Sequence, residues 1–255
     1  MRHILVSMMA AITLLLSTAA LGFDWEDYPQ FLHLSALPGN GFGVDNDGQV
    51  GFHGAYHMNV PCAYTPSRGN YSISYYSASD ENRVRFRFGG TETNGTGHIG
   101  VGLGKPGRGL YVTEVFVDED FVNTVNLQWQ VLPEDLEKPA VAIGILDIFD
   151  QRQKRGGING GARSFYATAT RQVSHGDQPA YASIGIGDGK FNGLFGAVTW
   201  YPADWVNLGF EYDGRIERPH AAFRVYENDG LTAAVGAAWS NFDRPVVGFS
   251  LTYSR

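Results

Sequence analysis

The chain has 255 residues, a formal net charge of −7 and 18% charged residues, against about a quarter in ordinary soluble domains. It carries no basic patch, so we expect no nucleic-acid partner. Cys62 is the single cysteine, which excludes an internal disulfide. A lone cysteine is more often a small core residue than a nucleophile, and we expect that role here.

The start of the chain has the pattern of an export signal. Arg2 and His3 precede an apolar run over residues 4–15 and a small-residue stretch over residues 17–22. This order is typical of a secretory signal peptide, and the run is shorter than the about 20 residues that a membrane-spanning helix needs. We predict that residues 1–22 are the signal peptide. Residues 23–48 alternate little and are rich in Gly, Asn, Asp and Pro, which predicts an N-terminal extension or a plug-like segment.

The rest of the chain reads as short strands. No later apolar run reaches the 18 residues of a candidate membrane helix, so a closed barrel is the remaining architecture that could cross a bilayer. Residues 206–213 illustrate the alternation: Val206, Leu208, Phe210 and Tyr212 share one face, and Asn207, Gly209, Glu211 and Asp213 share the other. Such alternation places the two faces of a strand in different environments.

A soluble β-sandwich also alternates, and the character of the two faces favours a barrel instead. The polar face consists of small residues, and the apolar face carries aromatic residues near the ends of the runs, such as Tyr212, Trp239 and Tyr253, as in interfacial girdles. We find about fourteen runs, some of which could be loop hairpins. Single-chain bacterial barrels have an even number of strands. We therefore predict an all-β fold, a closed antiparallel up-and-down transmembrane barrel of about 12 strands (10–14), over residues 49–255.

Polar side chains on the inner face are the candidate functional residues. The predicted lumen-facing set is Arg83, Arg85, Arg87, His53, His57, Glu211 and Asp213. The three arginines share one strand face and cannot face lipid, where each would cost about 2–4 kcal/mol at the midplane. They would either pair with acids such as Glu114, Glu211 or Asp213, or line a path for an anion. His53 and His57 lie about 13 Å apart along a strand, too far to share a metal ion.

We find no pattern that indicates catalysis, a cofactor or a metal. Residues 102–107 match G-x-G-x-x-G, but Pro106 and the next strand leave no room for the helix that this motif needs. We interpret them as a glycine-rich turn. No zinc-binding, dithiol or nucleophile-elbow pattern occurs. The expectation is therefore a protein that is not an enzyme, with no catalytic, cofactor-binding or metal-binding residues.

Several segments, taken in order, resemble the YjbH-like outer-membrane proteins. They are Asn59–Tyr64 with Gly69–Ile73, Leu127–Pro133 with Pro139–Phe149, Gly185–Phe191, Glu211-Tyr212-Asp213, and Arg244-Pro245. The resemblance covers about Tyr56 to Tyr253. It implies a β-barrel in the outer membrane with a role in exopolysaccharide export or surface assembly, and it brings no catalytic residue.

Three hypotheses follow. The first is a non-catalytic outer-membrane barrel that is an accessory of exopolysaccharide export, with outer-membrane lipid, polysaccharide and export-machinery proteins as its partners. The second is a purely structural or surface-exposed barrel without a transport role. The third is a soluble periplasmic glycan-binding β-sandwich or a glycosidase. The strand number does not separate an open lumen from a filled one, because 12 lies between filled eight-stranded barrels and open 16-stranded porins.

Overall fold

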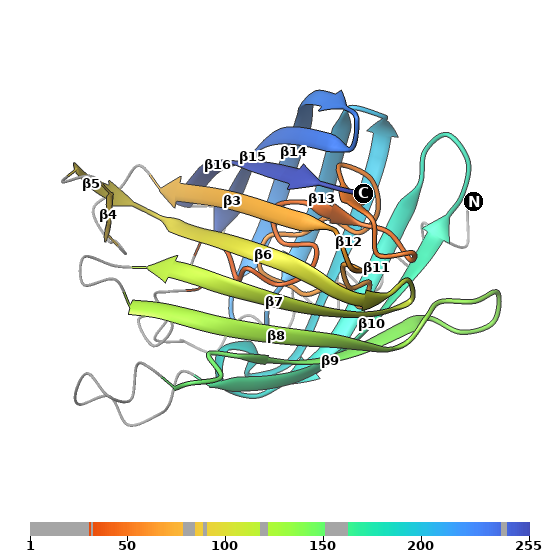
Figure 1. The fold of residues 1–255 in the computed structure, drawn as a ribbon, viewed down its shortest axis with the longest axis horizontal. Helices are drawn as coiled ribbons and strands as arrows, with labels where there is room; N and C mark the ends of the chain where they lie inside the picture. The colour runs from red at the N-terminus through yellow and green to blue at the C-terminus, as the bar shows by residue number, and fades with distance from the viewer. Residues whose placement is uncertain are drawn as a thin grey trace.

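The computed structural model describes residues 31, 33–78, 85–88, 91–117, 122–150, 163–240 and 244–255. Within these ranges, twelve antiparallel strands form one closed barrel (Figure 1). Neighbours in sequence are neighbours in the wall, and the barrel closes where β16 pairs with β3. The predicted closed antiparallel barrel of about 12 strands is confirmed. The predicted signal peptide lies outside the described residues.

The wall strands are β3 (Tyr71–Ala78), β6 (Thr96–Lys105), β7 (Arg108–Val117), β8 (Val122–Leu132), β9 (Ala140–Leu146), β10 (Ser164–Ser174), β11 (Ala180–Gly187), β12 (Gly193–Ala203), β13 (Val206–Tyr212), β14 (Glu217–Asn228), β15 (Leu231–Ser240) and β16 (Arg244–Tyr253). Two short antiparallel pairs lie outside this sheet: β1 (Gly43–Val44) with β2 (Val50–Gly51), and β4 (Arg85–Phe88) with β5 (Thr91–Asn94). A 3-10 turn, η4 (Gly189–Phe191), joins β11 to β12. Among the described residues, no helix is long and apolar enough to cross a membrane.

The wall strands point their side chains alternately into and away from the lumen. On β11, Ser183 is 5% exposed, whereas the next residue, Ile184, is 64% exposed. On β13, Asn207 and Glu211 are buried and Leu208 is exposed, which is the predicted register. The outer surface is a belt of exposed apolar side chains that includes Ile99, Ile143, Phe165, Leu194, Phe223 and Phe249.

The two ends of the barrel differ in their connections. At one end, tight turns join β6 to β7, β12 to β13 and β14 to β15. Asp229 and Gly230 both have positive φ, 48° and 80°, which is the geometry of the two-residue hairpin turn that favours Asp-Gly. Gly104 and Gly107, from the G-x-G-x-x-G stretch, likewise have positive φ at the β6–β7 turn, so the interpretation of that stretch as a turn is confirmed. The longer connections, β3 to β6 and β9 to β10, lie at the other end.

The predicted barrel domain begins at residue 49, whereas the wall itself begins later. The first wall strand begins at Tyr71, and within residues 49–70 only Val50–Gly51 forms a strand, paired with β1. We refer to Phe31 and residues 33–70 as the plug, because they lie inside the barrel (Figure 1). The run from Val50 to Val60 resembled a strand, but Gly54 has a φ of 94° and interrupts it. Residues 54–60 are buried on both sides, so the alternation does not mark an outer and an inner face there.

The prediction that the three arginines line the lumen is also not supported. Arg83 lies outside the described residues. Arg85 and Arg87 belong to β4, which pairs with β5 and not with any wall strand. The prediction assumed that every alternating run crosses the bilayer, and a hairpin beyond the wall meets no such constraint. Glu114, proposed as a partner for them, is on the outer side of β7, opposite Ile99.

The register of the wall predicts a labelling pattern for two adjacent residues of β11. In a Cys62→Ala background, a cysteine at Ile184 should react with a lipid-soluble thiol reagent in proteoliposomes. A cysteine at Ser183 should resist both this reagent and a water-soluble one, because the plug covers it. Mass spectrometry of the labelled protein gives the result, and reaction at Ser183 with protection at Ile184 would reverse the register.

Candidate functional site

The lumen is filled by the plug. Its segments contact wall strands all around the barrel: Thr113 of β7 donates to Ala36 O (2.9 Å), Gln128 of β8 to Cys62 O (2.9 Å), Thr168 of β10 to Pro61 O (3.1 Å) and Thr199 of β12 to Tyr56 O (2.6 Å). The wall supplies the side chain and the plug supplies a backbone carbonyl in each of these bonds. Because buried backbone groups need partners, the polar inner face lets an irregular segment occupy the barrel.

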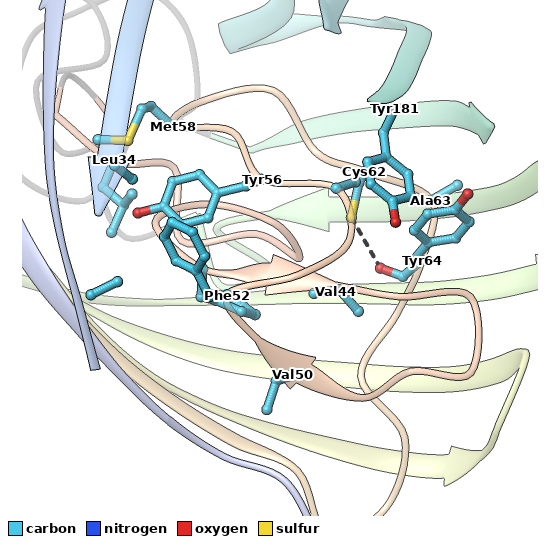
Figure 2. Close-up of a cluster of buried hydrophobic side chains, with 14 of the residues drawn as sticks. Leu34, Val44, Val50, Phe52, Tyr56, Met58, Cys62, Ala63, Tyr64 and Tyr181 are labelled. Carbon is cyan, nitrogen blue, oxygen red and sulfur yellow. Dashed lines mark hydrogen bonds between the residues drawn. The ribbon is translucent and has the colours of Figure 1, made fainter. Parts of the chain in front are cut away.

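The apolar and aromatic side chains of the plug form one buried cluster with inward side chains of the wall, such as Tyr76 and Tyr201. Phe52 packs edge-on against Tyr56, with ring centroids 6.0 Å apart, and Leu34 and Met58 belong to the same buried cluster (Figure 2). Cys62 is fully buried there and donates to Tyr64 O at 3.2 Å, as the sequence analysis expected of a core residue. The plug is therefore held in the barrel by packing as well as by hydrogen bonds.

Glu211 forms the most concentrated polar contact between wall and plug. Its carboxylate accepts the backbone N–H groups of three consecutive plug residues, Met58 (3.0 Å), Asn59 (2.9 and 3.0 Å) and Val60 (3.1 Å). Hydrogen bonds to a charged acceptor are about twice as strong as neutral ones. We refer to Glu211 with these three N–H groups as the latch.

A buried ionic cluster holds the latch carboxylate in place. Arg218 Nη1 lies 3.2 Å from Glu211 Oε1 and 3.4 Å from Asp213 Oδ2, and Lys190 Nζ lies 3.0 Å from the same Asp213 oxygen. The side chains of Arg218 and Glu211 have no exposure. Two positive and two negative charges balance, which offsets the cost of removing each from water.

Lys190 and Asp213 meet where the β11–β12 connection lies against the β13–β14 connection. Asp213 follows β13 and Lys190 lies in η4, so both are outside the wall strands. Burial by itself would raise the pKa of the Asp213 carboxyl, but Lys190 and Arg218 outweigh burial and hold that pKa at about 2. Asp213 Oδ1 also accepts the N–H groups of Arg215 and Ile216, which fixes the β13–β14 turn.

His57 makes a second polar contact between plug and wall. Its Nε2 lies 3.1 Å from Ser183 Oγ, and its Nδ1 lies 3.1 Å from Thr199 Oγ1. Ser183 is also 2.8 Å from Thr170 Oγ1. The ring is fully buried, so this group of side chains anchors the plug and offers no open site for a substrate.

Four of the predicted lumen residues, Glu211, Asp213, His53 and His57, thus lie at the plug or around it, but not all on wall strands. His53 and His57 belong to the plug, and His53 Nε2 lies 3.1 Å from Arg224 Nη1 of β14. Glu211 is on the inner face, and Asp213 is in the turn beyond it.

Sequence reasoning missed Arg218 and Lys190. Arg218 lies directly opposite Glu211 in the β13–β14 register, so alternation along residues 217–228 together with a hairpin register could have found it. Lys190 gave no signal beyond a Gly-Lys pair. Within the described part of the chain, no group of three or more His, Cys, Asp or Glu residues could hold a metal ion.

Comparison with known proteins gives a likeness to other barrels. No family model matches the chain, and no curated protein matches its sequence. Among solved structures, the chain is similar to a structure described as KdgM porin and to one of KdgM porin in complex with disordered oligogalacturonate. Each has a TM-score of 0.49 and 7% identity, with 73% of this chain and 99% of that chain covered. A NanC porin structure in a rhombohedral crystal form has a TM-score of 0.44 and 10% identity, with the same coverage.

The latch predicts that Glu211→Gln loosens the plug. The amide loses the charge that Arg218 needs, and breaking a buried ion pair costs about 3–5 kcal/mol. Cys62 is the single cysteine and is buried in the plug, so its reaction with a maleimide reports plug opening without any engineered label. We expect the rate to rise by more than about a hundredfold.

Glu227→Gln is the matched control, because Glu227 pairs with Arg224 in a more exposed position. It makes the same change of carboxylate to amide and should leave the Cys62 rate within about threefold of the wild type. Equal rates in wild type and Glu211→Gln, with both proteins folded, would contradict the latch.

The ion pair between Asp213 and Lys190 predicts that the folded protein loses stability in acid. Because its folded pKa is about 2 and its ordinary value is 3.8, its contribution is complete above pH 3.8 and is lost as the pH falls through 2. The difference corresponds to about 2 kcal/mol. The thermal unfolding midpoint should therefore fall between pH 4 and 2 more steeply in the wild type than in Lys190→Met/Asp213→Asn. Parallel slopes would contradict this assignment.

Proposed function

We propose that the chain is an outer-membrane β-barrel whose lumen is closed by its own N-terminal segment, and that it is a non-catalytic accessory of exopolysaccharide export or surface assembly. The observation that carries the proposal is a single closed sheet with an apolar outer face and a lumen filled by the plug. The resemblance to the YjbH-like proteins supports the choice of an exopolysaccharide as the polymer. The closed lumen corresponds, in this proposal, to the resting state of the accessory protein.

The outer face supports the membrane location. Leu194, Ile184 and Ile186 are 65%, 64% and 59% exposed, and each large apolar side chain left in water forgoes about 1.5–3 kcal/mol of burial. A belt of such residues around a closed barrel is the pattern of a lipid-facing wall. Tight turns and the C-terminus share one end, which we assign to the periplasm because outer-membrane barrels have short turns there.

The partners in this proposal are outer-membrane lipid, a polysaccharide and proteins of the export machinery, without nucleic acid. The soluble glycan-binding β-sandwich is not favoured, since the twelve wall strands form one closed sheet and not two packed sheets. A purely structural barrel is the second candidate, because a filled lumen suits a protein that conducts nothing.

Two measurements test the proposal. In isolated outer membranes, the protein should resist carbonate washing and migrate faster unboiled than boiled, because a folded barrel is compact. A deletion strain should release or display less exopolysaccharide, and the wild-type gene should restore it. Extraction by carbonate would exclude the membrane location, and unchanged polysaccharide with a folded membrane barrel would leave the structural role.

A disulfide that locks the plug to the wall distinguishes an export accessory from a purely structural barrel. Ala63 N–H donates to Thr170 Oγ1 at 2.7 Å, so Ala63→Cys with Thr170→Cys in a Cys62→Ala background should form a plug–wall disulfide. The same background without the two new cysteines is the control. If the plug must move during export, the oxidised lock should fail to restore polysaccharide although it inserts normally. Full restoration by the lock would favour a structural role.

A further inference from the structure

Most side chains of the inner wall are uncharged and carry hydroxyl or amide groups. Inward-facing polar residues include Ser72, Thr113, Asn126, Gln128, Thr170 and Thr199, all buried against the plug. Tyr111, Tyr166 and Tyr201 place aromatic rings among them. Hydroxyls, amides and aromatic rings recognise neutral hydroxyl groups and the faces of sugar rings through hydrogen bonds and apolar contact.

Charge on this wall is scarce and internally paired. On the described wall strands, the buried ionic side chains are Glu211, Glu217 and Arg218, and Arg224 contacts His53 of the plug. Glu211 and Arg218 pair with each other, and Arg224 pairs with Glu227. An acidic polymer would bring carboxylates to a surface where the described cations already have anionic partners. Burying an ion without a counter-charge is costly.

The plug itself demonstrates what the wall binds. Tyr201 OH lies within hydrogen-bond distance of two carbonyl acceptors, Phe52 O (2.6 Å) and Gly54 O (2.9 Å), and Asn126 Nδ2 donates to Ser35 O (3.1 Å). The charged residues within residues 33–70 are Asp45, Asp47 and Arg68. All three lie at the end of the plug nearest the tight turns, where Asp45 closes a loop with Gln49 and Arg68 N–H donates to Gly104 O. Apart from the Glu211 latch and the contact of Arg224 with His53, the wall side chains described above that bind the plug are uncharged.

Once the plug is displaced, the lumen is wide enough for a glycan chain. β1 and β2 lie side by side within it, and paired strands are spaced about 4.8 Å apart. The chain that follows adds a further segment beside β1, with Ala55 N–H donating to Val44 O at 2.9 Å. A single glycan chain needs no more width than these neighbouring segments occupy.

We propose that the inner wall is a binding surface for an uncharged polysaccharide, which replaces the plug backbone at the same hydroxyl and amide groups when the plug is displaced. The proposal rests on the proposed function, since it names the class of polymer that the barrel handles. It also assigns the plug a role: at rest the plug is an internal substitute for the glycan at those hydroxyl and amide groups of the wall that it binds.

The test measures sugar uptake by proteoliposomes that contain the full-length Phe52→Ala/Tyr56→Ala protein, which loses ring packing of the plug and keeps every charge of the wall. The probes are maltohexaose, which is neutral, and hexagalacturonate, which has the same length and is acidic. We expect maltohexaose to enter at least about tenfold faster, the ratio that corresponds to about 1.4 kcal/mol. A form of this protein that also carries the Ala63–Thr170 disulfide lock is the control, and it should admit neither sugar until it is reduced.

Each outcome decides the proposal. Equal uptake of both sugars, or faster uptake of hexagalacturonate, overturns the assignment of a neutral polymer. Uptake of neither sugar overturns displacement of the plug by a glycan, whether or not Cys62 has become reactive. The unboiled gel mobility of the same samples is read separately. A failure to form a folded, membrane-inserted barrel counts against the proposed function, whereas a folded barrel without the expected preference counts only against this inference.

Discussion

The carboxylate of Glu211 lies in an interior that excludes water, and it accepts three consecutive backbone N–H groups of the plug while it pairs with Arg218. Neither ion could remain there alone, because an unpaired buried charge costs several kcal/mol. Wall and plug are thus interdependent: the plug supplies the donors that stabilise Glu211, and Glu211 fixes the plug at the end of the barrel opposite its covalent link to β3. The Asp213–Lys190 pair extends this coupling to two turns.

The two faces of the wall meet opposite requirements, and alternation along each strand satisfies both. The outward side chains form an apolar belt, as a bilayer requires, and the inward ones are small or polar. With an empty lumen the inner face would need water. With the plug present, hydroxyls and amides of the inner face donate to backbone carbonyls of the plug. The wall groups that bind the plug at rest are the same groups that the proposed glycan would bind.

Much of the wall could be predicted from sequence, because each strand has two environments and a period of two. The plug could not, since a segment inside the lumen is buried on every side and loses that period. His57 seemed to share a strand face with His53, but the positive φ at Gly54 interrupts the run. The run that carries Arg85 and Arg87 alternates as a wall strand does, but β4 pairs with β5 in a separate sheet, and alternation alone does not distinguish the two arrangements. Arg218 needed the β13–β14 register, which fixes its position opposite Glu211.

The most direct test of a plug fixed by Glu211 is hydrogen–deuterium exchange of the protein in lipid nanodiscs, read at the backbone amides of Met58, Asn59 and Val60. These amides are not in any strand, yet they donate to a buried carboxylate. We predict that they exchange as slowly as the amides of the wall strands and become fast in Glu211→Gln. Exchange within seconds in the wild type, with the wall strands protected, would contradict a seated plug.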